Sequence, residues 1–405
     1  MAETPKRSFA PRRRPSGKPA AAEQPPRPSG GGASIEVRGI LDLRQDGTGF
    51  LRDPERNLEE RKSDPMVPKE LVRKFLLKAG SEIVAQASPG QPSPRARFVD
   101  SVDGLSLEEH RRRRHFRKLT VIDPDFHYEL GTHRQEGQIS MRILDVLAPL
   151  GRGQRALLVA PPRSGKTMLM QQVARAMEAL YPDVHLIVLL IDERPEEATY
   201  WKRNLERGEV FVSTMDETPK NHVRLAELVQ ARAERLVEAG KEAMILLDSI
   251  TRLARAYNHV AGNSGKTMSG GLDSRAMARP KAFFGAARNT EDAGSLTIMG
   301  TTLVDTGSRM DQVVFEEFKG TGNMELVLDR RLADRRIYPA IAVDKTGTRK
   351  EEKILLRTTL RRVNILRRVL SRMRPLEAME LMVGRLAQFP SNREFLDAFS
   401  MDDVE

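Results

Sequence analysis

The chain has 405 residues, of which 39% are hydrophobic, and its formal net charge is +11. Its length allows two or three domains with a sizeable core, and because it has no Cys, disulfides, zinc–thiolate sites and Fe–S clusters are excluded. No apolar run reaches the roughly 18 residues of a membrane helix, and the N-terminus lacks the apolar stretch of a secretory signal. We therefore expect a cytoplasmic protein with no membrane partner.

Residues 1–34 are rich in Pro, Arg, Ala, Gly and Ser. Such a composition cannot bury apolar surface, so the sequence predicts a disordered tail. Its many prolines disfavour the amphipathic helix of a transit peptide. The excess of Arg here, like the positive net charge, favours an electrostatic tether for a polyanion such as nucleic acid over a merely soluble basic protein.

Residues 35–103 form short alternating runs, such as "IEVRGILDL" and "SEIVAQA", separated by Gly and Pro turns. This pattern predicts a small β-barrel. Residues 104–136 are expected to be a basic linker. Its run "EEHRRRRHFRKL" is either a solvated linker or a phosphate contact.

Residues 137–405 alternate apolar strand-like runs with helix-like segments, and they end in amphipathic helices. This alternation predicts an α/β fold with a parallel sheet and crossover helices. The strand-like runs are "RALLVA", "VHLIVLLID", "AMILLD" and "SLTIMGTTLV".

The stretch "APPRSGKTML" follows the first of these strands and precedes a helical pattern, which is the context that a phosphate-binding P-loop requires. Backbone N–H groups of residues 164–167 would surround a β-phosphate at the helix N-terminus. Lys166 would reach the β- and γ-oxygens, and the Thr167 hydroxyl would bind Mg²⁺. Ala160 replaces the usual first Gly, but it only starts the turn, whereas Gly165 permits the close approach of the phosphate.

Two acidic residues end apolar strands. Asp248 ends "AMILLD" and would hold a Mg²⁺-bound water, although an Asp there could equally cap the following helix. Glu193, in "LLIDERPEE", could polarise the water that attacks the γ-phosphate. Its alternative interpretation, a solvent-facing loop acid, remains open on the sequence.

Several motifs together resemble the bacterial transcription termination factor Rho family: "GRGQRALLVAPPRSGKTML", "LLIDERPEEATY", "LLDSITRLARAYN", "RPKAFFGAARN", "EEFKGTGNMEL" and "GTRKEE". The resemblance covers about residues 137–375. It implies a RecA-like ATPase domain behind an OB or cold-shock-like barrel. It also implies a homohexameric ring around single-stranded RNA, which binds ATP between subunits, moves 5′ to 3′ and dislodges the RNA polymerase elongation complex.

The resemblance also assigns the nucleotide site. It implies that Glu193 is the catalytic base, that Asp248 is linked to Mg²⁺, and that Arg349 is an arginine finger supplied across the subunit interface, with Lys166 on the phosphates. The implied nucleotide contacts are Gly151, Arg152, Gly153, Gln154, Arg155, Ala156, Arg163, Ser164, Gly165, Lys166, Thr167, Met168, Arg194 and Tyr338, the last as an adenine-stacking aromatic.

Two Gly-rich loops resemble the family's RNA contacts in the ring pore. The first carries Lys319, Gly320, Thr321 and Gly322, and the second carries Lys266. The second loop repeats Gly-Lys-Thr, but no apolar strand precedes it, so we reject it as a P-loop.

In the barrel, Phe50 and Arg52 match the family's RNA-binding strand, with Arg52 and nearby basic residues left for phosphates. Thr48 stands where the family has a second Phe, Met66 replaces a usual Tyr, and Phe98 is expected nearby. Because base stacking needs aromatics, we expect salt-sensitive RNA loading with less sequence preference. We expect that the disordered tail replaces the helical bundle that usually precedes the barrel in this family.

Two other functions are considered. The chain could be a different RecA-like ATPase, such as a rotary ATP synthase catalytic subunit, but that would not explain the barrel, the basic charge or "FKGTGNM". It could also be an RNA-binding ring without productive turnover, which the joint presence of Lys166, Thr167, Glu193, Asp248 and Arg349 argues against.

Overall fold

The computed structural model of the chain describes residues 34–133, 138–262, 271–273 and 275–398. The predicted basic tail therefore lies outside the described residues, apart from Ser34. In the part of the chain that is described, no helix is both long enough and apolar enough to cross a membrane.

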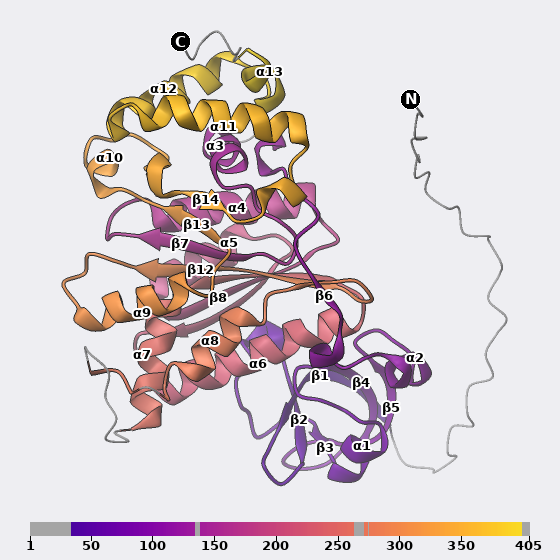
Figure 1. Ribbon diagram of the computed structural model, residues 1–405. Coiled ribbons are helices and arrows are strands. Elements are labelled where there is room, and N and C mark those ends of the chain that lie inside the picture. Colours follow the sequence, from indigo (N-terminus) through magenta and orange to yellow (C-terminus); the bar gives the residue numbers. More distant parts are fainter. Residues whose placement is uncertain (1–33, 134–137, 263–270, 274, 399–405) are drawn as a thin grey trace, which may run out of the picture. The chain divides into compact units, whose positions relative to one another are not determined.

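The predicted small barrel is confirmed as a closed five-stranded sheet in the order β1-β2-β3-β5-β4 (Figure 1). Side chains alternate between the interior and the surface, as in β4, where Ile83, Ala85 and Ala87 are buried. Two short helices accompany the barrel, α1 (Lys69–Lys74) and α2 (Leu107–Arg112). The strands are β1 (Ile35–Leu43), β2 (Gly49–Arg52), β3 (Met66–Val67), β4 (Glu82–Ser88) and β5 (Arg95–Val102).

The predicted α/β domain is also confirmed. Its seven-stranded sheet has the order β14-β13-β7-β12-β10-β8-β9, and every neighbouring pair is parallel except β13 with β14. Parallel strands end at one side of a sheet, here called the carboxyl edge, and begin at the other, the amino edge. The strands are β7 (Arg155–Ala160), β8 (His185–Glu193), β9 (Glu209–Thr214), β10 (Glu242–Asp248), β12 (Ser295–Leu303), β13 (Met324–Val327) and β14 (Gly347–Thr348).

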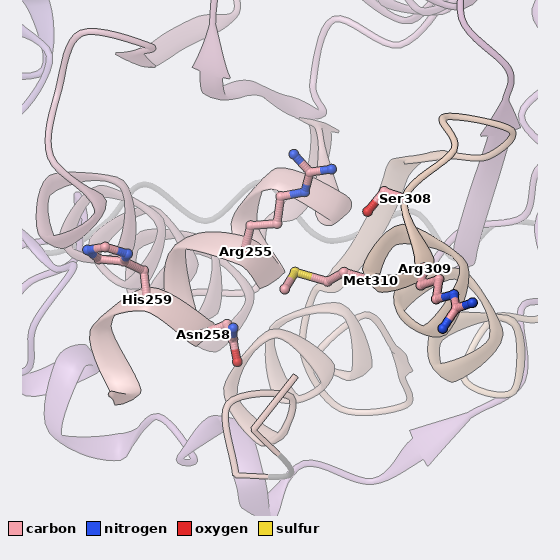
Figure 2. Close-up of a pocket in the computed structure, with 6 residues that line it drawn as sticks. All are labelled: Arg255, Asn258, His259, Ser308, Arg309 and Met310. Carbon is pink, nitrogen blue, oxygen red and sulfur yellow. The ribbon is translucent and has the colours of Figure 1, made fainter. Parts of the chain in front are cut away.

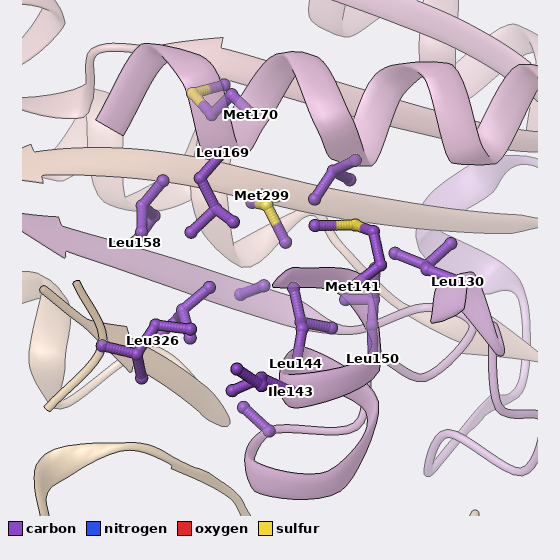
Figure 3. Close-up of a cluster of buried hydrophobic side chains, with 14 of the residues drawn as sticks. Leu130, Met141, Ile143, Leu144, Leu150, Leu158, Leu169, Met170, Met299 and Leu326 are labelled. Carbon is purple, nitrogen blue, oxygen red and sulfur yellow. The ribbon is translucent and has the colours of Figure 1, made fainter. Parts of the chain in front are cut away.

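Helices cover both faces of this sheet because its central strands are apolar on both sides (Figure 1). Leu158 points into a core shared with α4 and the C-terminal helices (Figure 3), whereas its neighbours Leu157 and Val159 point into a second core with α6 and α7. The helices are α3 (Gln138–Leu147), α4 (Lys166–Leu180), α5 (Pro195–Asn204), α6 (Pro219–Glu238), α7 (Ile250–Ala261), α8 (Ala278–Gly285), α9 (Arg309–Lys319), α10 (Arg330–Asp334), α11 (Arg357–Ser371), α12 (Pro375–Gln388) and α13 (Asn392–Asp397).

The segment expected to be a basic linker is instead folded. Phe116 and Tyr128 are buried in the two cores, and β6 (Val121–Ile122) pairs with β11 (Asn289–Thr290). Much of its positive charge is neutralised within the chain, since Arg113 donates to Asp103 at 2.6 Å. Arg112 pairs with Glu108 and Arg114 with Asp292. The segment is therefore not the solvated linker that the sequence predicted. Arg112 and Arg114 stay exposed, so a phosphate contact by this run remains a prediction.

Candidate functional site

The predicted phosphate loop lies at the carboxyl edge, between the end of β7 and the start of α4. Gly165 has a φ of 92°, which favours glycine, and Lys166 begins the helix. The Ser164 hydroxyl donates to the Pro161 carbonyl at 2.7 Å and holds the turn closed. The first N–H groups of α4 therefore stand at a tight turn, where a helix N-terminus binds anions.

Three charged side chains meet beside this loop. The Lys166 Nζ donates to Asp248 Oδ1 at 2.6 Å and lies 3.5 Å from Glu193 Oε1. Both carboxylates are nearly buried, and they come together because β10 and β8 are neighbours that end at the same edge. The Thr301 hydroxyl donates to the same Asp248 oxygen at 2.8 Å. Glu193 is thus part of the site and not a solvent-facing loop acid.

The helix-cap interpretation of Asp248 is wrong. The N-cap of α7 is Ser249, whose hydroxyl accepts from the Arg252 N–H at 3.2 Å. Asp248 instead directs its carboxylate toward Lys166 and Thr301.

Arg194, Glu197 and Arg252 surround Glu193. The Arg194 N–H donates to Glu193 Oε2 at 3.3 Å and Arg194 caps α5. Arg252 Nη1 lies 3.5 Å from Glu193 Oε1, a contact that the sequence pattern did not identify. Burial raises the pKa of Glu197, and the Glu193 carboxylate adds to the rise.

A cavity of about 380 Å³ opens next to the loop and is partly lined by Gly165, Met168 and Tyr338. The Tyr338 ring is so close that a Cβ added to Gly165 would lie 3.4 Å from its Cε1 atom. The Tyr338 side chain remains half-exposed, with its hydroxyl donating to the Ala333 carbonyl at 3.4 Å. This arrangement leaves a ring face beside the phosphate loop, as adenine stacking requires.

The residues at the loop fit a Mg²⁺ ion. Among the described residues, no group of three or more His, Cys, Asp or Glu could hold a metal. Mg²⁺ in nucleotide sites does not need such a group, because waters and phosphate oxygens supply most of its ligands. Thr167, in the first turn of α4, and Asp248, at the end of β10, offer the oxygen donors that the ion prefers.

Other predicted nucleotide contacts are not brought to this loop. Residues 151–156 lie at the amino edge, and β7 alone separates Arg155 from Ala160 by about 17 Å. Their side chains hold the fold: Arg152 donates to Glu242 at 2.8 Å, and Gln154 donates to Asn323 Oδ1 at 2.7 Å. Within one chain this segment supports the fold, and its predicted contact with a nucleotide between subunits stays a prediction.

Arg349 also lies at the amino edge. Its N–H donates to the Asn323 carbonyl at 2.9 Å, directly after β14. The Arg155 N–H donates to the Asn323 side chain at 2.8 Å, so Arg349 and the start of β7 are neighbours. Arg349 therefore stands apart from the phosphate loop of its own chain.

The first predicted RNA loop, residues 319–322, is at the amino edge as well. The Lys319 Nζ lies 5.6 Å from the centroid of the Phe315 ring, and Arg155 Nε donates to the Thr321 carbonyl at 2.9 Å. Lys266 lies outside the described residues. The described residues resume at Gly271, whose carbonyl accepts a hydrogen bond from the Asn258 side chain at 3.3 Å.

A cavity of about 620 Å³ adjoins this point (Figure 2). Arg255, Asn258 and His259 line it from α7, and Ser308, Arg309 and Met310 line it from the start of α9. Arg255 is fixed by Asp311, with N–O distances of 2.9 and 2.7 Å.

Arg309 is exposed at this cavity and has no recorded carboxylate partner in the described part of the chain. It follows β12 on a turn in which Gly307 has a φ of 77°. Arg309 was not among the predicted RNA contacts, although "DTGSR" follows an apolar strand and combines a Gly with a cation, as the two predicted loops do.

The barrel carries a further cavity of about 690 Å³, whose lining includes Phe50 as its one aromatic, with Met66 opposite Phe50 in the register. The guanidinium carbon of Arg44 stands 4.3 Å from the Phe50 ring centroid. Exposed cations Arg95 and Arg97 also line the cavity. This surface offers cations for RNA phosphates and one aromatic ring, Phe50, for stacking a base. It therefore agrees with the expected loss of aromatic residues.

Two barrel predictions are corrected by the packing. Arg52 is only 2% exposed, and it donates to Asp42 at 2.9 Å and to Asp64 at 2.6 Å, so its guanidinium is already paired with carboxylates. It supports the barrel and is not available for a phosphate. Phe98 packs edge-on against Phe75, with centroids 6.3 Å apart, and does not line the cavity.

Replacing Arg52 with Met should lower the free energy of unfolding by roughly 3–5 kcal/mol, because Asp64 loses its cation and Asp42 keeps only the more distant Arg224. Thermal unfolding of the full chain measures this loss. The matched control is Arg44→Met, which removes an exposed arginine from the same cavity and should leave stability unchanged while weakening RNA binding. If the Arg52→Met protein is as stable as the unmodified chain but binds RNA poorly, Arg52 contacts phosphate and our correction is wrong.

Comparison with known families agrees with both halves of the structure. Residues 37–109 match the RNA-binding domain of the Rho termination factor. Residues 140–346 match the nucleotide-binding domain of the ATP synthase alpha/beta family.

Curated relatives match nearly the whole chain. Transcription termination factor Rho 1 of Ehrlichia chaffeensis is 47% identical over 378 residues, which is 91% of this chain and 89% of the relative. Transcription termination factor Rho of Chromobacterium violaceum is 48% identical over 373 residues, covering 91% and 88%. The corresponding protein of Aquifex aeolicus is 46% identical over 372 residues, covering 90% and 85%.

A solved structure shares the fold. The assembled ATPase EscN from the type III secretion system of enteropathogenic E. coli superposes with a TM-score of 0.54 at 22% identity. The match covers 70% of this chain and 63% of that one. At this identity the likeness shows the architecture alone.

Proposed function

The chain belongs to the transcription termination factor Rho family, and from this membership we propose that it terminates transcription as an ATP-driven ring acting on RNA. The observation that carries the proposal is the convergence of Lys166, Glu193 and Asp248 beside the phosphate loop, on a chain that also has an RNA-binding barrel. The loop supports ATP binding, and the carboxylates support hydrolysis.

In the proposed reaction the N–H groups at the start of α4 bind the phosphates, and Lys166 leaves its carboxylates to contact the β- and γ-oxygens. Glu193 then orients the attacking water and accepts its proton, while Tyr338 stacks on the adenine. Mg²⁺, held by Thr167 and through water by Asp248, would neutralise charge on the phosphate oxygens. The Arg194 N–H keeps Glu193 in position.

A single chain lacks one part of this site, since Arg349 stands at the amino edge. We infer that a second copy supplies it, as in a homohexamer whose subunits face each other head to tail. In such a ring the predicted contacts of residues 151–156 would also be made to the neighbour's nucleotide. The arginine would stabilise charge that develops on the transferred phosphate.

Single-stranded RNA is the proposed track. The barrel cavity, the segment carrying Lys266, the turn carrying Arg309 and the loop carrying Lys319 all present cations. Turnover around the ring would move these loops along the RNA from 5′ to 3′, as a helicase, until the ring meets the RNA polymerase elongation complex in the cytoplasm.

The decisive experiment is ATPase activity with and without a panel of RNA homopolymers. Hydrolysis should be weak alone and strong with RNA, and the altered barrel should give little preference among the homopolymers. Turnover that is independent of RNA would favour a rotary-type ATPase. No turnover under any condition would favour an RNA-binding ring that does not hydrolyse ATP.

The loop cations can be tested separately. Arg309→Ala and Lys319→Ala should each lower RNA-stimulated ATPase about tenfold or more while ATP binding is retained, because neither residue lies at the phosphate loop. Lys202→Ala, an exposed lysine of α5, is the control for charge. If RNA stimulates the ATPase of a variant as much as that of the unmodified chain, the replaced residue does not contact the RNA.

A further inference from the structure

A row of arginines occupies one exposed face of α11 and continues past its end. Arg357, Arg361, Arg368 and Arg372, here called the arginine row, are all exposed. At 100° per residue, their positions fall within an arc of about 60° around the helix axis. The row therefore presents a single cationic face and not a scattered set of charges.

Within the described part of the chain, no acidic side chain pairs with this face. The helix α11 contains no Asp or Glu, and no ion pair or side-chain hydrogen bond of the row is recorded among the described residues. The helix's other two arginines are paired: Arg367 contacts Glu351 at 2.5 and 2.8 Å, and Arg362 pairs with Asp397. The described residues thus pair with the arginines beside the row and with none of the four arginines in it.

Part of the row is unfavourable for the helix that carries it, although the helix dipole favours Arg368 in the last turn. Arg357 is the first residue of α11, where the helix dipole disfavours a cation. Arg357 with Arg361, and Arg368 with Arg372, place like charges four residues apart, which destabilises a helix.

An ordinary solvated face mixes both signs, as the next helix does. There, exposed Glu377 and Glu380 accompany Arg385. Helix stability therefore does not explain the whole row, whereas an anionic partner would explain all four arginines.

We propose that the arginine row binds the phosphate backbone of single-stranded RNA, at a surface separate from the barrel and from the loop cations. This proposal rests on the proposed function, because it takes as its ligand the RNA on which the ring acts. The row extends over about 22 Å, the length of roughly six stacked nucleotides. Guanidinium groups bind phosphate oxygens bidentately, whereas α11 has no aromatic residue for stacking a base. Binding is therefore sensitive to salt and indifferent to sequence.

The test compares two variants that each lose four positive charges, at different places on the surface. One carries Arg357→Gln, Arg361→Gln, Arg368→Gln and Arg372→Gln. The control carries Lys202→Gln, Arg203→Gln, Arg207→Gln and Lys220→Gln, all exposed and outside the row. Fluorescence anisotropy with a long homopolymer RNA gives the affinity at several salt concentrations, and circular dichroism melting verifies that both proteins fold.

The row variant should bind the long RNA at least tenfold more weakly at low salt, and the slope of log K against log salt should fall by up to about 3. The control should stay close to the unmodified chain. Crosslinking of RNA to the unmodified chain should label peptides that contain α11. The ATPase rate at saturating RNA should be unchanged in the row variant, since none of its residues belongs to the ATP site.

Equal losses in both variants would overturn the proposal, because the effect would then come from net charge alone. A row variant that binds RNA normally but loses affinity for duplex DNA, or for an acidic protein, would overturn RNA as the ligand. Failure of the proposed function is distinguishable, since it would appear as the absence of RNA-stimulated ATPase in the unmodified chain.

Discussion

Lys166→Ala should abolish ATP hydrolysis, with a loss of at least 10²–10³-fold, the order found when one donor to developing charge is removed. Lys166 is the cation on the phosphate loop, and its Nζ donates to Asp248 at 2.6 Å. Steady-state ATPase at saturating RNA measures the loss. Binding of a non-hydrolysable ATP analogue should weaken as well, because the same ammonium contacts the ground-state phosphates.

The geometry adds a second consequence of this substitution. Without Lys166, Glu193 keeps Arg252 at 3.5 Å and the Arg194 N–H at 3.3 Å, and Asp248 keeps the neutral hydroxyl of Thr301. Two nearly buried carboxylates are then left with less compensation, so the nucleotide-free protein should melt at a lower temperature. Lys202→Ala, which removes an exposed lysine, should change neither measurement. Retained turnover would show that the loop is not the ATP site.

Arg349→Ala should lower kcat by about 10³–10⁵-fold, the range for arginine fingers, while ATP affinity changes little. The Arg349 N–H donates to the Asn323 carbonyl at the amino edge, whereas the phosphate loop lies at the carboxyl edge. Its effect on catalysis therefore has to be exerted on the nucleotide of a neighbouring copy. Arg335→Ala, an exposed arginine close in sequence, is the matched control.

Mixing the two inactive variants tests this arrangement directly. In a mixed ring, an Arg349→Ala subunit contributes an intact loop, and a Lys166→Ala neighbour contributes an intact arginine. About one interface in four is then complete in an equimolar random assembly, so RNA-stimulated hydrolysis should reappear. If Arg349 acted within its own chain, every subunit would remain defective and the mixture would stay inactive.

Local sequence patterns were sufficient to predict most of the fold. Apolar runs that end in Ala160, Glu193 and Asp248 identified parallel strands, because strands buried on both faces are apolar throughout. The same patterns placed the phosphate loop correctly, since a strand, a Gly-rich turn and a helix start lie within a few consecutive residues.

Errors arose where the answer depended on partners far away in the sequence. Arg52 has the position of a surface cation on a strand, but Asp42 and Asp64 bury it. The arginines after Ser106 resembled a linker, but Asp103 and Asp292 pair with two of them. Charge is visible in a sequence, whereas its neutralisation is a property of tertiary contacts.

The sequence by itself determined the architecture, the phosphate loop and the chemical identity of its charged residues. Only the tertiary structure decided which of them meet. It placed Lys166 between Glu193 and Asp248, and it separated residues 151–156 and Arg349 from that loop by the length of a strand. The physical reason is that local periodicity specifies elements, while the edge of the sheet at which a residue stands depends on how the strands are ordered and directed.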